Sequence, residues 1–412
     1  MMKYVIIGNG VAGVTAAETI RQHDASGDIS MISDETFPPY CRPMISNFLE
    51  GAVPSEKLPI RGKDFYDKNR ITPVLGSRAA FLDPDSCMVT TKDGRQLPYD
   101  RLLIACGADP RRLDAGGTEL ENIFFMRNIN QVRQMIDALP QVKNALVLGG
   151  GLVGFKAAYS LLRRGVSVTM LIRSGYPLSM QVDETAGRMI REVLQSHGLT
   201  VRTGVSVEAF EGSGRVEKAL MSDGNRTACD MAVIGKGVFP AHGFVPVDRI
   251  KTDAGILVDE NMHTSASGIY AAGDVAEYFD LSRQKHWVNA IWPEAVSQGR
   301  VAGMNMAGHR ISYRGSLSRN VIRMFDTDVM CAGRVSERDV DESCRTATAF
   351  DPRRNTYRKL VFEGNILVGF VMVNNVEQGG VLTSLVTSRM PVDISDRYLL
   401  DPGFNFSRFM RL

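Results

Sequence analysis

The chain has 412 residues, of which 44% are hydrophobic and 23% charged, and its formal net charge at pH 7 is +2. These figures describe a folded protein of two or three domains and exclude a disordered chain. Because no long run of Lys or Arg accompanies the small net charge, we expect small molecules or proteins as partners, with no nucleic acid and no membrane.

The N-terminus enters an apolar segment at once, without the pattern of a signal peptide, and no apolar run reaches membrane-spanning length. Six cysteines lie scattered, with no CxxC pair and no cluster of metal ligands. We therefore expect a reduced, cytoplasmic protein without a bound metal.

Two similar strand–turn–helix units stand out in chain order. The predicted strand at 4–7 leads into Gly8-Asn9-Gly10-Val11-Ala12-Gly13, and the predicted strand at 145–148 leads into Gly149-Gly150-Gly151-Leu152-Val153-Gly154. The first glycine of such a fingerprint permits a tight turn, the second lets the backbone approach a pyrophosphate, and the third packs the helix onto the strand. One fingerprint is weak evidence, but two in the same context predict two dinucleotide sites.

The strands that follow the two units are succeeded by residues of opposite charge. The strand at 29–33 is followed by Asp34 and Glu35, either of which is the acid expected on an adenosine ribose. The strand at 168–172 ends without an acid, and Arg173 follows, which is typical of NADP sites. One arginine without a second basic neighbour is a weak phosphate site, so NAD is favoured and NADP stays possible.

Two further stretches are Tyr99-Asp100-Arg101-Leu102-Leu103-Ile104-Ala105-Cys106-Gly107 and Gly268-Ile269-Tyr270-Ala271-Ala272-Gly273-Asp274. With the two fingerprints, their order resembles the pyridine-nucleotide-disulfide oxidoreductase superfamily of flavoproteins. The resemblance implies an α/β fold with two Rossmann-like, three-layer domains, the second inserted in the first, and a small α+β C-terminal domain. The implied ranges are 1–112 with 240–318 for FAD, 113–239 for NAD(P) and 319–412 for the C-terminal domain, which has a predicted hairpin turn at 363–365.

The resemblance also implies cofactor contacts late in the chain. Asp274 would hydrogen-bond the flavin ribitol, although a helix N-cap is an alternative. The segment with Trp292, Pro293 and Ala295 would close over the flavin pyrimidine edge, although Trp292 is also typical of a packed core. The same reasoning adds four cofactor-binding positions: Ala105, Gly107, Gly237 and Gly273.

The stretch 39–47 resembles the flavin-contacting segment of the rubredoxin-reductase, ferredoxin-reductase and nitrite-reductase-like branches. Arg42 and Pro43 would face the anionic part of FAD, and Ser46 would begin the turn that reaches the flavin ring, whereas a plain surface loop is the alternative. Cys41 lies near the redox cysteine of coenzyme A disulfide reductases and NADH oxidases. Because Arg-Pro follows it instead of Gly, we favour an inert cysteine, although Arg42 would lower the pKa of a neighbouring thiol.

Two departures from these relatives are linked. Relatives commonly have Lys at the position of Asn47 and Glu at the position of Lys156, and those two groups meet beside the flavin. We hypothesise that Lys156 here supplies the cation that stabilises reduced flavin as hydride arrives. A solvated helix-surface lysine is the alternative.

The predicted function is hydride exchange between nicotinamide and FAD, with electrons passed to or from an iron–sulfur or rubredoxin-type protein. The chain resembles FAD subunits of multisubunit phenylglyoxylate and tungsten aldehyde oxidoreductases. Alternatives are a coenzyme A disulfide reductase or NADH oxidase using Cys41, and a flavin-bound assembly subunit without turnover. The aromatic C-terminus at 401–412 is either a docking tail or a tail folded onto its own core.

Overall fold

The computed structural model describes residues 1–404 and contains a five-stranded parallel sheet near the N-terminus, with the order β19-β7-β1-β2-β3. Its strands are β1 (Lys3–Ile7), β2 (Asp28–Ser33), β3 (Ile71–Leu75), β7 (Arg101–Ile104) and β19 (Ile269–Ala271). Because the fifth strand comes from much later in the chain, the polypeptide leaves this sheet after β7 and returns to it.

The second sheet is built from the intervening chain, with the order β12-β11-β10-β16-β9. Its strands are β9 (Ile123–Phe124), β10 (Asn144–Leu148), β11 (Ser167–Ile172), β12 (Thr200–Thr203) and β16 (Met231–Ile234), and their pairings are parallel. The predicted insertion of one Rossmann-like unit into another is confirmed. We keep the domain ranges 1–112 with 240–318, 113–239 and 319–412 as a proposal.

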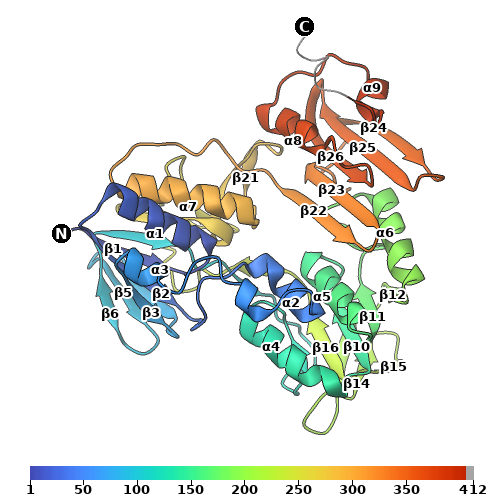
Figure 1. The fold of residues 1–412 in the computed structure, drawn as a ribbon, viewed down its shortest axis with the longest axis horizontal. Coiled ribbons are helices and arrows are strands. Elements are labelled where there is room, and N and C mark those ends of the chain that lie inside the picture. The colour runs from blue at the N-terminus through green and yellow to red at the C-terminus, as the bar shows by residue number, and fades with distance from the viewer. Residues whose placement is uncertain (405–412) are drawn as a thin grey trace.

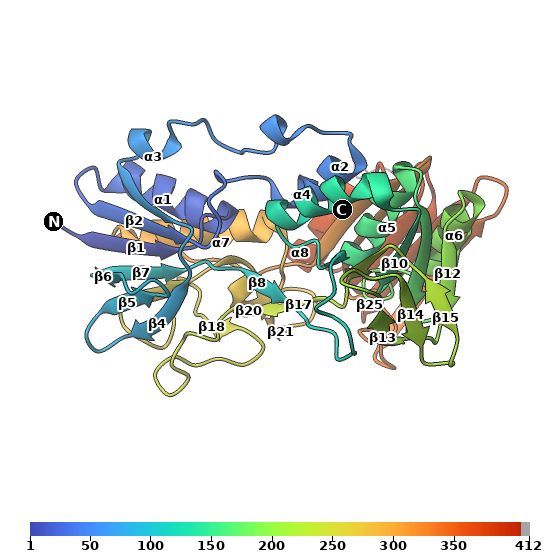
Figure 2. The ribbon, with the colours of Figure 1, turned by 90° about the horizontal axis from the view of Figure 1, so that it is seen from below.

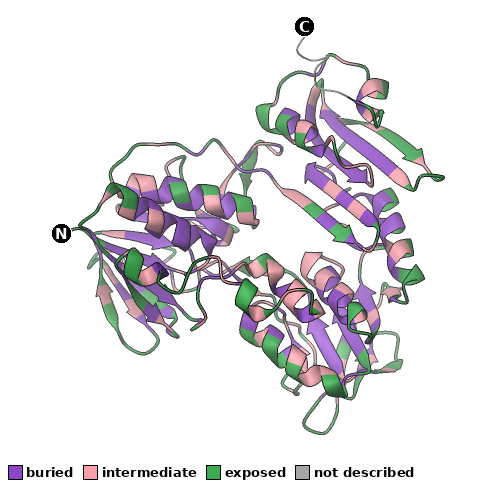
Figure 3. Ribbon diagram, in the orientation of Figure 1, coloured by how far each residue is buried: buried purple, intermediate pink, exposed green. Residues whose placement is uncertain are grey.

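Each parallel sheet lies between helices and a small antiparallel sheet (Figure 2). The helices are α1 (Val11–His23) and α7 (Trp292–Met306) at the first sheet, and α4 (Ile129–Ala138), α5 (Leu152–Arg163) and α6 (Glu184–Ser196) at the second. The small sheets are β4 (Ala79–Asp83), β5 (Met88–Thr91) and β6 (Gln96–Pro98), and β13 (Val207–Glu211), β14 (Lys218–Met221) and β15 (Arg226–Ala228). With both faces covered, strands such as β1 and β10 are apolar and buried (Figure 3).

Short elements connect these layers. They are α2 (Ile45–Glu50), α3 (Phe65–Lys68), β8 (Ala108–Pro110), β17 (Val238–Pro240), β18 (Ile256–Leu257), β20 (Ala276–Asp280) and β21 (Lys285–Trp287). Strands β8 and β17 pair with each other where the chain passes between the two parallel sheets.

The C-terminal domain is a five-stranded antiparallel sheet with two helices, in the order β22-β23-β26-β25-β24. Its elements are β22 (Arg319–Met324), β23 (Thr327–Gly333), β24 (Cys344–Asp351), β25 (Thr356–Glu363), β26 (Ile366–Val373), α8 (Gly379–Ser388) and α9 (Asp396–Leu400). Glu363 pairs with Ile366 across the turn, so the predicted hairpin is confirmed. Phe404 is buried in this domain, and the rest of the predicted docking tail, 405–412, lies outside the described residues.

This domain packs against α6 of the second Rossmann-like unit (Figure 1). The Tyr357 hydroxyl donates to Asp183 Oδ2 at 2.6 Å, and Lys359 Nζ lies 3.3 Å from the same oxygen. Asp183 also caps α6, because its Oδ1 accepts from the Ala186 backbone N–H. These buried contacts fix the C-terminal sheet relative to the nucleotide-binding unit.

Candidate functional site: two dinucleotide sites

The first glycine turn joins β1 to α1 and is shaped by close backbone contacts. Gly8 has φ +117°, and a Cβ on it would lie 2.1 Å from the Ala105 carbonyl oxygen. A Cβ on Gly13 would lie 2.0 Å from the Gly8 carbonyl oxygen. Glycine is therefore required at both positions, and its absence of a side chain holds α1 tightly against β1.

The middle glycine of this turn faces open space. Nothing lies within 4 Å of a Cβ built on Gly10, and its φ of −70° would suit any residue. Neither the backbone nor a neighbouring protein atom therefore requires glycine at this position. Gly10 is also the N-cap of α1, with no side-chain cap, and no acidic residue lies in the first turn at Val11 and Ala12. Unpaired amides, the helix dipole and free space together fit the pyrophosphate of FAD.

The second glycine turn repeats this geometry between β10 and α5. Gly149 has φ +110°, a Cβ on Gly154 would lie 2.0 Å from the Gly149 carbonyl oxygen, and nothing lies within 4 Å of a Cβ on Gly151. Gly151 is an N-cap without a side-chain cap, and Leu152 and Val153 begin an acid-free first turn. Unpaired amides, the helix dipole and free space therefore fit the pyrophosphate of a second dinucleotide here as well.

The two acids after β2 differ in availability. Glu35 is 7% exposed, and its carboxylate accepts from Arg42 Nη2 at 2.5 Å and from the Tyr40 hydroxyl at 2.7 Å. Asp34 has a side chain that is 58% exposed and lies 3.8 Å from Arg78. Because both oxygens of Glu35 are engaged, the geometry favours Asp34 as the acid for the adenosine ribose.

Two arginines, Arg42 and Arg127, lie close to the first site. Arg42, which we expected to face FAD, also donates through Nη1 to the Arg127 carbonyl oxygen at 3.0 Å. Arg127 Nη2 lies 3.3 Å from Asp274 Oδ2, and the same nitrogen is 3.3 Å from a Cβ built on Gly107. Sequence reasoning missed Arg127, since no motif marks it and its partner is 147 residues away.

The late residues meet the start of α1. A Cβ on Gly273 would lie 3.3 Å from the Ala12 Cβ and 3.6 Å from the Ala295 Cβ, so the first turns of α1 and α7 are neighbours. Trp292 and Pro293 begin α7, whose N-cap is Ile291. Asp274 lies in a 3₁₀ turn, Gly273–Val275, whose N-cap is Ala272, so the N-cap alternative for Asp274 is not observed. Two helix N-termini therefore lie close together, and their dipoles favour an anion there.

The predicted flavin-contacting stretch lies against α5 of the other unit. The Ser160 hydroxyl donates to the Ser46 carbonyl oxygen at 2.8 Å, and Lys156 Nζ donates to the Pro43 carbonyl oxygen at 3.4 Å. Asn47 is in α2, which packs on α5. Lys156 thus contacts the stretch 41–47, and burial lowers its pKa below the ordinary value for lysine. Its role toward the flavin stays a hypothesis.

Cys41 lies beside this lysine and is not activated. Burial raises the pKa of the Cys41 thiol, while the Met44 backbone N–H and the charge of Lys156 lower it to a smaller extent. Our expectation that Arg42 would lower this pKa is not met, because Arg42 is occupied by Glu35 and the nearby charge comes from Lys156. The geometry supports the inert interpretation of Cys41.

At the second site, Arg173 is exposed directly after β11, and Lys236 is exposed after β16. The next residue, Gly237, has φ +89° and accepts from the Arg111 backbone N–H at 3.0 Å, which joins the ends of β17 and β8. Lys236 is a second basic group at this edge of the sheet, and sequence reasoning did not identify it.

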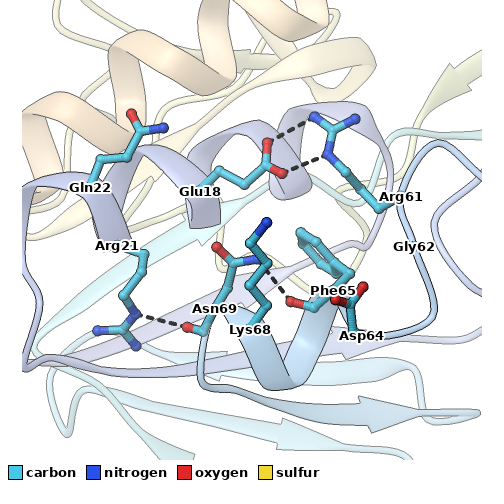
Figure 4. Close-up of a pocket in the computed structure, with 9 residues that line it drawn as sticks. All are labelled: Glu18, Arg21, Gln22, Arg61, Gly62, Asp64, Phe65, Lys68 and Asn69. Carbon is cyan, nitrogen blue, oxygen red and sulfur yellow. Dashed lines mark hydrogen bonds and ion pairs between the residues drawn. The ribbon is translucent and has the colours of Figure 1, made fainter.

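A separate pocket lies between the C-terminal half of α1 and α3 (Figure 4). Glu18 and Arg61 form two hydrogen bonds of 2.6 and 2.8 Å across it, and Arg21 donates to the Asn69 carbonyl oxygen. This pocket is away from both glycine turns. Among residues 1–404, no three His, Cys, Asp or Glu side chains form a metal site, and no helix has the length and hydropathy to cross a bilayer.

Comparison with known proteins agrees with this geometry. The chain is 29% identical over 404 residues to the NADH-dependent phenylglyoxylate dehydrogenase subunit epsilon of Aromatoleum evansii, covering 97% of this chain and 95% of that protein. It is also 29% identical over 399 residues to the nitrite reductase (NAD(P)H) of Bacillus subtilis (strain 168), covering 95% of this chain and 48%, or about half, of that relative. The covalent putidaredoxin reductase–putidaredoxin complex superposes with a TM-score of 0.90 at 24% identity, covering 100% of this chain and 98% of that chain, which confirms the fold.

Residues 319–390 match the rubredoxin NAD+ reductase C-terminal domain, and residues 2–299 match the pyridine nucleotide-disulphide oxidoreductase family. The second match spans most of the chain and confirms the predicted enzyme class, an oxidoreductase with FAD and a nicotinamide nucleotide as cofactors. The chain therefore belongs to the pyridine nucleotide-disulphide oxidoreductase family.

Proposed function

We propose that the chain exchanges hydride between a nicotinamide nucleotide and FAD, and passes electrons to or from an iron–sulfur or rubredoxin-type protein. The observation that carries this proposal is the pair of matching glycine turns, joined where α5 of the second unit contacts the stretch 41–47 of the first. The expected flavin-contacting stretch thus contacts the helix that begins at the second glycine turn.

The protein's part in this chemistry is binding, orientation and charge. Bound FAD would supply two-electron hydride chemistry toward nicotinamide and single-electron chemistry toward a redox protein. The N-termini of α1 and α7 hold the anionic parts of FAD, and the Arg127–Asp274 pair orders the edge between them. Lys156 holds a positive charge at the Pro43 carbonyl, next to where the two cofactors are proposed to meet.

An external redox partner is favoured because the chain offers no second redox group of its own. All six cysteines are free, and no two form a CxxC pair. Curated relatives include rubredoxin–NAD(+) reductases and a subunit of phenylglyoxylate dehydrogenase. We therefore propose that this chain is the FAD subunit of a larger cytoplasmic oxidoreductase complex, in which it reacts with the nicotinamide nucleotide.

Anaerobic stopped-flow spectroscopy of the FAD-loaded protein tests this proposal. We expect NADH or NADPH to bleach the flavin absorbance near 450 nm within seconds, and oxidised ferredoxin or rubredoxin to restore it. A flavin that stays oxidised with both nucleotides would support the assembly-subunit alternative. Purification of the native protein should also recover an iron–sulfur subunit in fixed stoichiometry.

A further inference from the structure

The edge of the second sheet that faces the nucleotide carries cations. The carboxylates that border it are engaged with other groups, Asp183 with Tyr357 and Lys359, and Glu337 with Tyr176. Three segments follow the C-terminal ends of β10, β11 and β16, at 149–156, 173–182 and 235–243. They contain Lys156, Arg173 and Lys236, and no Asp or Glu. At the first sheet, by contrast, Asp34 follows β2 with an exposed carboxylate.

At the second sheet a cation takes the position of the acid. The Gly149 backbone N–H donates to the Leu171 carbonyl oxygen as the Gly8 N–H donates to that of Ile32, so Arg173 corresponds to Asp34 and Ile172 to Ser33. Ile172 ends β11 and is 1% exposed, and its Cγ2 would be 2.5 Å from a Cβ on Gly150. It therefore packs onto the glycine turn and offers no acceptor for a ribose 2′-hydroxyl. A nucleotide that relies on this hydrogen bond loses it here.

The loop after Ile172 is fixed so that Arg173 is presented at the turn. The Leu178 backbone N–H donates to the Gly150 carbonyl oxygen at 2.7 Å, and Arg191 Nη1 donates to the Gly175 carbonyl oxygen at 3.2 Å. These bonds hold the loop at both its end and its middle. Arg173 is therefore exposed on a loop with a fixed backbone, and the five N–H donors of its guanidinium can bind a ligand.

Lys236 supplies the second basic group of the same edge. Strands β11 and β16 both neighbour β10, so their ends lie roughly 10 Å apart on either side of Gly149 (Figure 1). Partial desolvation, and to a smaller extent the charge of Arg173, lower the pKa of Lys236. Two cations that repel across an open turn are stabilised when an anion binds between or beside them.

We propose that the nucleotide site accepts a 2′-phosphate, so that NADPH is a substrate, with Arg173 binding the phosphate and Lys236 adding positive charge. This inference rests on the proposed function and assigns the nucleotide class of that site. An Arg–phosphate contact is bidentate and charge-assisted, and at position 173 it replaces the ribose hydrogen bond that an acid would accept there.

Isothermal titration calorimetry with 2′,5′-ADP and 5′-AMP tests the site without turnover. We expect the FAD-loaded protein to bind 2′,5′-ADP at least about tenfold more tightly than 5′-AMP, and added salt to reduce this ratio. Arg173→Ala and Arg173→Asp should each bring the ratio to within about threefold, and Lys236→Gln should reduce it less. Arg188→Ala, at an exposed arginine of α6 paired with Glu184, is the matched control and should keep the ratio.

Equal binding of the two compounds by the native sequence, or a ratio that survives Arg173→Ala, would overturn this inference. Stopped-flow reduction separates it from the proposed function. Flavin bleaching by NADH with NADPH at least tenfold less efficient would reject the 2′-phosphate site alone. Tight 2′,5′-ADP binding without bleaching by either nucleotide would reject the hydride-transfer proposal instead.

Discussion

The two glycine turns of this protein have the same backbone and opposite surroundings. Gly10 and Gly151 are both N-caps with extended backbone and no atoms within 4 Å of a built Cβ. Around the first turn, a second helix N-terminus, Asp274 and Arg127 converge. Around the second turn, Arg173 and Lys236 are exposed, and Arg173 stands where Asp34 stands at the first turn.

This difference shows that the glycine fingerprint determines only the pyrophosphate site, whereas the residues around it determine which dinucleotide is bound and how tightly. The turn provides amides and space for a pyrophosphate at either place. The first site is lined by elements from three distant parts of the chain, which suits a cofactor that stays bound. The second is bordered by segments that follow three neighbouring strands of one sheet, with Arg173 and Lys236 exposed, which suits a nucleotide that enters and leaves at each turnover.

The largest expected effects come from substituting the glycines within each turn. Gly13→Ala puts a Cβ 2.0 Å from a backbone oxygen and should lower the free energy of unfolding by about 3 kcal/mol. Gly10→Ala meets nothing in the apoprotein, so its unfolding free energy should stay within about 0.5 kcal/mol of the native value. Its FAD affinity should nevertheless fall at least about tenfold, because the methyl group takes pyrophosphate space. Urea unfolding and FAD titration measure these quantities.

Gly151→Ala is the matched control at the second turn. It should retain FAD and weaken nicotinamide nucleotide binding, which is the reverse of Gly10→Ala. Loss of FAD from the Gly151→Ala protein, or native FAD affinity in the Gly10→Ala protein, would contradict the assignment of the two turns.

Much of this architecture could be predicted because it depends on local rules. The strand–glycine–helix units and the hairpin at 363–365 follow from period, turn residues and glycine spacing. The pairs that complete the sites could not be predicted, because they join residues far apart in sequence. Arg127 meets Asp274 only when the chain returns to the first sheet, and Lys236 approaches Arg173 only through the order of strands around β10. Tyr40 and Arg42 likewise occupy Glu35 by tertiary contact, which no fingerprint encodes.

A smaller effect is expected at the contact between the two units. Lys156→Met removes a cation next to the stretch 41–47 and should lower the flavin midpoint potential by roughly 20–60 mV, equivalent to about 1–3 kcal/mol for a two-electron couple. Hydride transfer to the flavin should slow in parallel. Spectroelectrochemistry and stopped-flow reduction measure the two effects.

The pH dependence of this effect distinguishes charge from packing. Because burial lowers the pKa of Lys156, its ammonium is lost as pH rises through that lowered value. The potentials of the native and Lys156→Met proteins should therefore differ most at low pH and converge at high pH. Lys92→Met, at an exposed lysine of the first unit, is the control, and a difference independent of pH would show that Lys156 acts only by packing.

The smallest effect is expected at Cys41, where the two units also meet. Its raised thiol pKa means that the thiolate fraction at pH 8 is below that of an ordinary cysteine and grows only as pH increases further. Iodoacetamide should therefore alkylate Cys41 more slowly than the exposed Cys87, as followed by peptide mass spectrometry. Cys41→Ser should keep the rate of flavin reduction within about twofold, since hydride exchange between the two dinucleotides needs no thiol. The Cys41→Ser protein could instead lose a disulfide-reducing or oxygen-reducing activity while its flavin is still reduced at the native rate. That outcome would identify Cys41 as a second redox centre and contradict the inert interpretation.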